Sequence, residues 1–199
     1  MTVTSISLLD RAREDAGSDS WEQLVAIYSP LLRRWVGRFE IQASDADDLV
    51  QEVLIAIARE IPGFKHSGRT GAFRSWIRTM LVHRLQNHWR SKKYRPSVKG
   101  GASVLDQLCE LDDASSGVSQ MWDSEHDRHV LSKLLTLLRP RFQEHTWQAF
   151  ERQMLDGKSP DVVAKELDMP IHSVYVAKSR VLNAMRNEAA GLVDSVDLL

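Results

Sequence analysis

The spacing of apolar residues constrains this chain more than any other feature of its sequence. Apolar side chains recur every three or four residues along most of its 199 residues, without the alternating β-branched runs that indicate strands. The pattern is clearest after Ser44, a suitable N-cap followed by acids, and it ends at Pro62-Gly63. An earlier helix is expected to begin at Ser20 and to bend or break at Pro30. We therefore expect an all-α protein.

A second feature is a stretch without acids, from Ile61 to Leu105. It holds ten Lys or Arg residues and three His, although the whole chain is nearly neutral, with 26 basic and 27 acidic side chains. Cations bind phosphates and flat rings stack on unpaired bases, so this stretch indicates nucleic-acid binding. The alternative is a solvated helix whose charge is balanced by acids elsewhere in the fold. The aromatic residues of the stretch are Phe64, Phe73, Trp76, Trp89 and Tyr94.

The helix expected from Asp45 to Ile61 has an apolar stripe on one side and an acidic surface on the other. That surface carries a single apolar residue, Ile55, among Asp48, Gln51 and Glu52. An acidic surface with one exposed apolar residue is typical of a docking site for a partner. The alternative is an isolated surface Ile, which is common in soluble proteins.

The acid-free stretch itself divides into a loop and a helix. The loop 64–71 contains two glycines and carries Lys65, His66 and Arg69. The helix 72–91 is expected to bury a stripe that includes Phe73 and Trp76. Its other face is expected to present to a nucleic acid Ser75, Arg78, Thr79, Val82, His83, Gln86, Trp89 and Arg90.

After Pro96 the apolar periodicity is lost. Residues 97–123 are rich in Ser, Gly and Asp, which predicts an acidic flexible linker between two small helical domains, 1–96 and 124–192. Such a linker either shields the basic face or only keeps the connection solvated.

The second domain contains the spacing of a helix-turn-helix. Ser159-Pro160 provides an N-cap and a proline at the first helical position. Small Ala164 allows two helices to cross closely, and Asp168 occupies the turn position that favours left-handed backbone. The second helix is expected to run from His172 to Asn187, with cations for phosphates or base edges at Lys178, Arg180 and Arg186.

Other classes of protein find little support in the sequence. It has no glycine-rich phosphate loop, nucleophile elbow or cysteine pair, so we expect neither an enzyme nor a cofactor. His126 and His129 could share a helix face as metal ligands, but a surface pair in an acidic linker is the simpler interpretation. No apolar run is long enough to span a membrane, and the single Cys109 fits a reducing cytoplasm.

Taken together, these motifs resemble the extracytoplasmic-function subfamily of bacterial sigma-70 transcription initiation factors. In the first domain the resemblance rests on WEQLVAIYSPLLRRWVGRF, DADDLVQEVLIAIAREIPGF and GAFRSWIRTMLVHRLQNHWR. In the second domain it rests on the helix-turn-helix from Pro160 to Arg186. The resemblance implies a partner, core RNA polymerase, and promoter DNA as the bound nucleic acid. It leaves open whether an anti-sigma factor or a kinase controls the protein.

The resemblance also implies roles for individual residues. Asp48, Gln51, Glu52 and Ile55 would dock on the clamp helices of the polymerase's largest subunit. The minus-ten element would be melted and bound by Lys65, His66, Arg69, Arg78, His83, Asn87, Trp89 and Arg90. The minus-thirty-five element would be read by His172, Ser173, Tyr175, Lys178, Ser179 and Arg180.

The chain departs from the family pattern at two sites. Family members commonly have Asn at His83 and Asp at Asn87, so the minus-ten base preference is expected to differ. The usual Lys-Ser-Arg run early in the recognition helix is replaced by Tyr175, Val176 and Ala177, with the cations following later.

Two alternative functions make different predictions. A helix-turn-helix repressor would bind duplex DNA without polymerase and would carry a ligand cavity or a dimer interface in its first domain. A purely protein-binding module would not explain the acid-free stretch. The sigma interpretation predicts a monomer when free, weak DNA affinity alone and a 1:1 complex with core polymerase.

Overall fold

The computed structural model describes residues 7–14, 19–65, 71–91 and 104–193. Within these ranges the prediction of an all-α fold is confirmed, because every regular element is a helix. The α-helices are α1 (Leu8–Glu14), α2 (Asp19–Val36), α3 (Ala43–Glu60), α4 (Ala72–Ser91), α5 (Val104–Asp112), α6 (Gly117–Leu138), α7 (Glu144–Met154), α8 (Pro160–Glu166) and α9 (Ile171–Ala189). Three 3₁₀ turns, Gly37–Phe39, Ile61–Gly63 and Arg139–Arg141, follow α2, α3 and α6.

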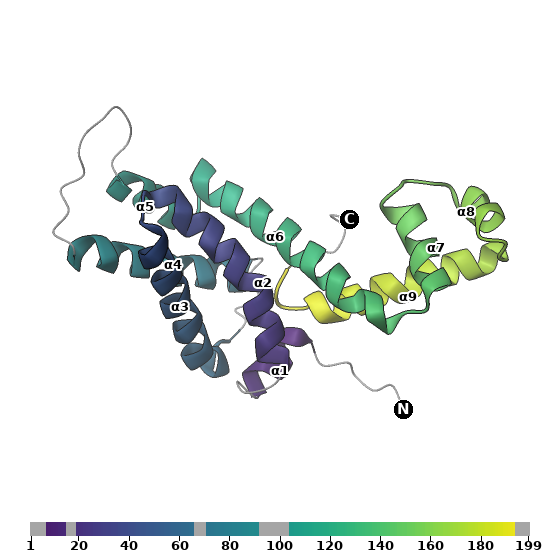
Figure 1. Ribbon diagram of the computed structural model, residues 1–199, viewed down its shortest axis with the longest axis horizontal. Helices are drawn as coiled ribbons and strands as arrows, with labels where there is room; N and C mark the ends of the chain where they lie inside the picture. Colours follow the sequence, from purple (N-terminus) through teal and green to yellow (C-terminus); the bar gives the residue numbers. More distant parts are fainter. Residues whose placement is uncertain (1–6, 15–18, 66–70, 92–103, 194–199) are drawn as a thin grey trace.

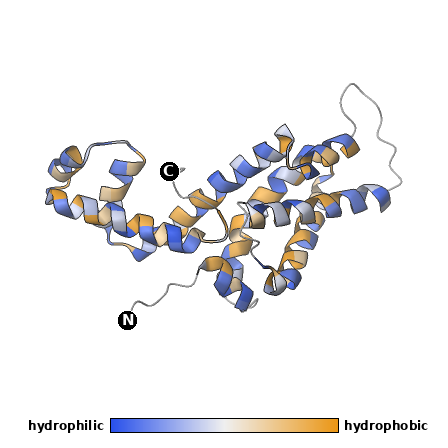
Figure 2. Cartoon of the chain, turned by 180° about the vertical axis from the view of Figure 1, so that it is seen from behind, coloured by the Kyte–Doolittle hydropathy of each residue, from blue (hydrophilic) through white to orange (hydrophobic). Residues whose placement is uncertain are grey.

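The molecule has two ends that are joined by α6 (Figure 1). Helices α2, α3, α4 and α5 gather at one end, and α7, α8 and α9 form the other. Figure 2 shows hydrophobic and hydrophilic residues on the same helices, as the three- and four-residue spacing requires. One apolar core runs through both ends and includes residues from Leu8 to Val193. A second, smaller core lies between α7, α8 and α9.

The first bundle is built mainly from α2, α3 and α4. Its largest fully buried side chains include Tyr28 and Trp35 of α2 and Phe73 of α4. Helix α2 continues through Pro30 to Val36, so of the two expected effects of the proline, a bend or a break, the break does not occur. Tyr28, Leu31 and Leu32 around the proline are buried, and this packing offsets the backbone hydrogen bond that proline removes. Helix α3 begins at Ala43 with Gln42 as N-cap, so Ser44 is not the cap.

Residues 104–123 are mostly helical and packed, so they do not form the predicted flexible linker. Within the expected linker 97–123, residues 104–112 form α5 and residues 117–123 begin α6, while residues 97–103 lie outside the described residues. Ser116 caps α6 by accepting a hydrogen bond from the Ser119 amide at 3.0 Å. The two helices are fixed because their apolar residues enter the core of the first bundle, where Leu108, Leu111 and Trp122 are fully buried.

The C-terminal helix, α9, ends next to the first helix of the chain. The end of α9 packs on α1, and the buried carboxylate of Glu188 accepts hydrogen bonds from Arg11 of α1 and from Arg141. Leu192 and Val193 then join the main core. The two ends of the molecule are therefore connected by packing as well as by α6.

Candidate nucleic-acid interface

The exposed side of α3 matches the predicted docking surface. Asp48, Gln51, Glu52 and Ile55 are all exposed, and 57% of Ile55 is accessible to solvent. The opposite stripe, which includes Leu49 and Val53, is buried, so the orientation of α3 is set by the core. Ile55 is therefore not covered by the core of the bundle.

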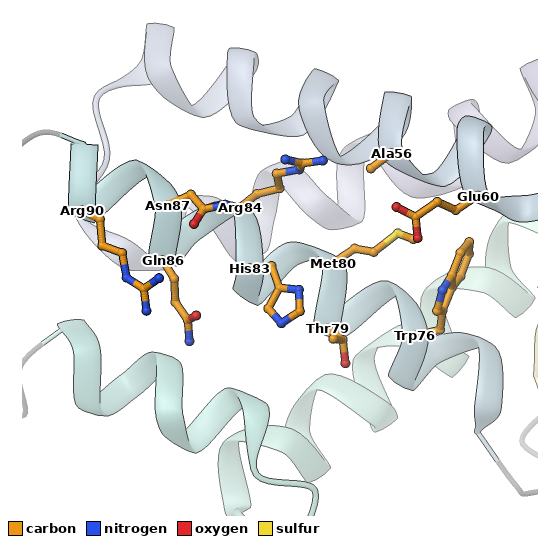
Figure 3. A pocket seen from close by; sticks show the side chains of 10 residues that line it. All are labelled: Ala56, Glu60, Trp76, Thr79, Met80, His83, Arg84, Gln86, Asn87 and Arg90. Atoms are coloured by element: carbon orange, nitrogen blue, oxygen red, sulfur yellow. The ribbon is translucent and has the colours of Figure 1, made fainter.

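A groove of about 500 Å³ lies between α3 and α4 (Figure 3). Its walls combine polar and apolar side chains, with two arginines, one histidine, a single acid, Glu60, and one partly exposed aromatic ring, Trp76. Trp76 is held in place by Phe64 and Phe73, whose ring centroids lie 4.9 and 5.5 Å from it. The residues that line the groove are Ala56, Glu60, Trp76, Thr79, Met80, His83, Arg84, Gln86, Asn87 and Arg90.

The groove brings together some of the predicted minus-ten residues and not others. His83, Asn87 and Arg90 line it, and all three are exposed. Lys65 is exposed at the start of the loop, while His66 and Arg69 lie outside the described residues. Trp76 and Arg84 also line the groove, although neither is among the predicted minus-ten residues. The helical period had assigned Trp76 to the buried stripe.

Trp89 does not lie on the basic exposed face, so that prediction is wrong. It is half-buried and packs against the main core, with its ring centroid 5.8 Å from that of His88. The aromatic ring that lines the groove is that of Trp76.

Arg78 is also misplaced by the prediction, because α6 covers it. Only 4% of Arg78 is exposed, and its Nη1 lies 3.3 Å from Oδ1 of Asp123. Arg74, one turn earlier, lies 3.3 Å from Asp123 and 3.0 Å from Asp127. Val82 of the same face is fully buried. For Arg74 and Arg78, the alternative of a basic charge balanced by acids elsewhere is the correct one.

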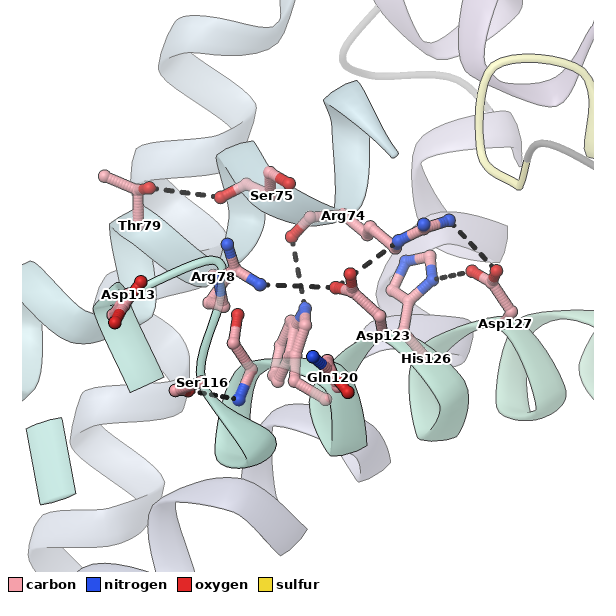
Figure 4. A network of polar contacts seen from close by, with 12 residues as sticks. Arg74, Ser75, Arg78, Thr79, Asp113, Ser116, Gln120, Asp123, His126 and Asp127 are labelled. Carbon is pink, nitrogen blue, oxygen red and sulfur yellow. Dashed lines mark hydrogen bonds and ion pairs between the residues drawn. The ribbon is translucent and has the colours of Figure 1, made fainter. Parts of the chain in front are cut away.

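These groups belong to a network that we call the α4–α6 cluster: Arg74, Arg78, Asp123, His126 and Asp127 (Figure 4). His126 is fully buried, with Nδ1 2.8 Å from Asp127 and Nε2 2.9 Å from the Tyr28 hydroxyl. A neutral ring that donates from Nδ1 and accepts at Nε2 satisfies both partners. Burial lowers the pKa of His126 despite the opposing effect of Asp127. Burial also raises the pKa of Tyr28 well above its ordinary value.

The two histidines considered as metal ligands have protein partners instead. His126 is bonded within the cluster, and Nε2 of His129 lies 2.7 Å from the carbonyl oxygen of Ile27. Burial lowers the pKa of His129 as well. Both rings tie α6 to α2, which is a structural role.

At the other end of the molecule, α8 and α9 are joined by a tight turn. Asp168 has a φ of 48°, so the predicted left-handed turn position is confirmed. The Met169 amide donates to the carbonyl oxygen of Ala164 at 3.0 Å. Val163 of α8 packs on Val174 and Ala177 of α9. Pro160 begins α8 as expected, but the Ser159 side chain makes no capping hydrogen bond.

The predicted minus-thirty-five residues lie along the first half of α9. His172, Tyr175, Ser179 and Arg180 are exposed, whereas Ser173 and Lys178 are half-buried. Nearby, Glu166 of α8 is paired with Lys158 at 2.8 Å and Arg152 at 2.7 Å, and the Lys158 hydrogen bond lowers the pKa of its carboxyl group. None of the described helices is long and apolar enough to cross a membrane.

Comparison with protein families finds a match to the first bundle. Residues 24–95 match the family model for sigma-70 region 2, which covers most of α2 together with α3 and α4. A search of curated proteins found no match to the chain. The matched range contains both the exposed α3 face and the groove beside α4. The chain carries a sigma-70 region 2 domain at residues 24–95.

Proposed function

We propose that this chain is an alternative sigma factor of the extracytoplasmic-function type, which binds core RNA polymerase and directs it to particular promoters. The observation that carries the proposal is the match to sigma-70 region 2, within which an acidic-apolar face and a groove with two arginines lie on neighbouring helices. A polymerase subunit works where the polymerase does, so we place the protein in the cytoplasm. It is proposed to be a monomer when free.

The polymerase contact is assigned to the exposed side of α3. Ile55 provides an apolar centre and Asp48, Gln51 and Glu52 provide a polar rim, which is the usual anatomy of a binding hot spot. The acids favour a basic partner surface, and the clamp helices of the largest subunit are the proposed one.

Minus-ten recognition is assigned to the groove between α3 and α4. Its volume of about 500 Å³ falls within the range of small-ligand sites, so it accepts a single unstacked base. Trp76 offers a ring for stacking, and His83 and Asn87 offer hydrogen bonds to base edges. Arg84 and Arg90 supply charge for the flanking phosphates, with Lys65 at the nearby loop. Unstacking costs a few kcal/mol per base, and these contacts must offset about that much.

Minus-thirty-five recognition is assigned to α8 and α9 as a helix-turn-helix. The tight turn at Asp168 and the close packing of Val163 on Val174 fix the crossing of the two helices. Helix α9 would then lie in the major groove, with its first turns against the bases.

The experiment that tests this assignment measures strand opening. Permanganate footprinting on supercoiled DNA with core polymerase should show reactive thymines near a start site only when the chain is added. Arg90→Ala should reduce opening by about tenfold, the effect expected for a lost contact of 1–2 kcal/mol. Arg34→Ala, which removes an exposed arginine from α2, is the matched control. A repressor would instead bind duplex DNA alone and give no opening.

A further inference from the structure

The first two turns of α9 carry two exposed apolar side chains. Ile171 is 40% exposed and Tyr175 is 52% exposed. They are four residues apart, so they lie side by side on one face of the helix. A different side of α9, with Val174 and Ala177, already forms the small core with α7 and α8. Folding of this end of the molecule therefore does not require Ile171 or Tyr175 to be apolar.

The charge around this pair favours a polyanion. Helix α9 contains no acid between Ile171 and Asn187, and the nearby Glu166 is neutralised by Lys158 and Arg152. Lys178 and Arg180 follow one turn later, and neither has an acidic partner within the part of the chain that the structure describes. Lys178 comes three residues after Tyr175 and therefore flanks the apolar pair. Arg180, nine residues after Ile171, lies on another side of the helix.

Duplex DNA presents one apolar group in the major groove that matches such a centre. Only thymine has a 5-methyl group there, and side chains contact it by apolar packing rather than by hydrogen bonds. The first residues of a recognition helix are those that reach base edges. Ile171 and Tyr175 occupy these positions, whereas the cations lie further along the helix.

We propose that Ile171 and Tyr175 read thymine 5-methyl groups in the major groove of the upstream promoter element, while Lys178 contacts an adjacent phosphate. Recognition by α9 is then selective for A·T pairs through apolar contact. This inference rests on the proposed function of α8 and α9 as the reader of upstream DNA. It adds Ile171 to the site and gives Tyr175 a specific ligand.

The test replaces thymine by deoxyuridine, which lacks the methyl group but pairs in the same way. The full chain in complex with core polymerase is first used to select upstream duplexes from a random pool. Each thymine of the selected element is then replaced singly. We expect binding to weaken about fourfold for each methyl group that is contacted, the effect of losing one buried methyl.

Protein variants connect this effect to the residues. Tyr175→Ala should weaken binding and abolish the response to deoxyuridine at the thymine that Tyr175 contacts, while the response at the thymine that Ile171 contacts remains. Tyr175→Phe should retain both responses because the ring makes the contact. Lys178→Ala is the matched control, since it should lower affinity and salt dependence and keep the response. Circular dichroism checks that each variant is folded, as expected for an exposed position.

Several results would overturn the inference. If no substitution of thymine changes affinity while the complex still opens promoters, α9 reads DNA in another way and the proposed function stands. If Ile171→Ala and Tyr175→Ala weaken binding to core polymerase without changing DNA selection, the pair is a protein contact. If the complex shows no upstream DNA selectivity at all, both the inference and the assignment of α9 fail.

Discussion

Replacement of Asp127 by Asn should destabilise the whole protein, because Asp127 holds α6 on the first bundle. Its carboxylate is 13% exposed and accepts hydrogen bonds from the buried His126 and from Arg74, at 2.8 and 3.0 Å. The substitution keeps the shape of the side chain and removes its charge. Loss of one partner from a buried ion pair costs 3–5 kcal/mol, but Arg74 keeps Asp123 at 3.3 Å. We therefore expect the free energy of unfolding to fall by about 2–3 kcal/mol.

Urea and thermal unfolding measure this effect. For a chain of this size the expected loss lowers the melting temperature by about 5–10 °C. Asp156→Asn, at an exposed position beyond α7, is the matched control and should change little. If Asp127→Asn lowers stability by less than about 0.5 kcal/mol, the range of ordinary surface substitutions, then the α4–α6 cluster does not hold α6 in place.

Three further predictions concern pH, docking and the backbone. Because burial lowers the pKa of His126, the unfolded chain binds a proton at this residue before the folded chain does as the pH falls through about 6.5, so stability should decrease on acidification. His126→Gln should therefore reduce the proton uptake that accompanies unfolding between pH 7.5 and 5.5. An unchanged proton uptake would contradict this prediction. Ile55→Arg should weaken binding to core polymerase by about 2 kcal/mol, measured by co-elution, without changing the unfolding midpoint. The control Val162→Arg, at an exposed position of α8, should bind normally in the same assay. Equal binding by both variants would show that Ile55 is not part of the interface. Gly71→Ala should lower the free energy of unfolding by about 1–3 kcal/mol, because φ at Gly71 is 74° and the new Cβ would lie 2.7 Å from the Arg74 guanidinium. Gly63→Ala is the control, since its new Cβ meets no atom within 4 Å. Similar losses of stability in the two variants would refute the strain argument.

The parts of the fold that follow from local pattern were predictable. Helix α3 combines a clear apolar stripe with helix-ending residues, and its period placed Ile55 on the exposed side. The turn at Asp168 was predictable for the same reason, because backbone requirements at one position depend on nearby residues. Both predictions needed no knowledge of distant contacts.

The errors arise where distant residues meet. The composition of residues 104–123 indicated a solvated linker, but Asp123 and its neighbour Asp127 pair with arginines from α4, about 50 residues earlier in the chain. No local pattern shows that acids in one segment will neutralise cations in another. Likewise, Arg78 is buried because α6 packs against α4, which the sequence of α4 alone does not indicate.

The measurement that tests the central claim most directly is transcription by a defined polymerase. Bacterial core RNA polymerase is incubated with the chain and fragmented bacterial genomic DNA, and the 5′ ends of the transcripts are sequenced. We predict discrete start sites that are absent with core polymerase alone and that share upstream sequences at about minus ten and minus thirty-five. Transcripts that are the same with and without the chain, together with no association between chain and polymerase, would contradict its function as a sigma factor.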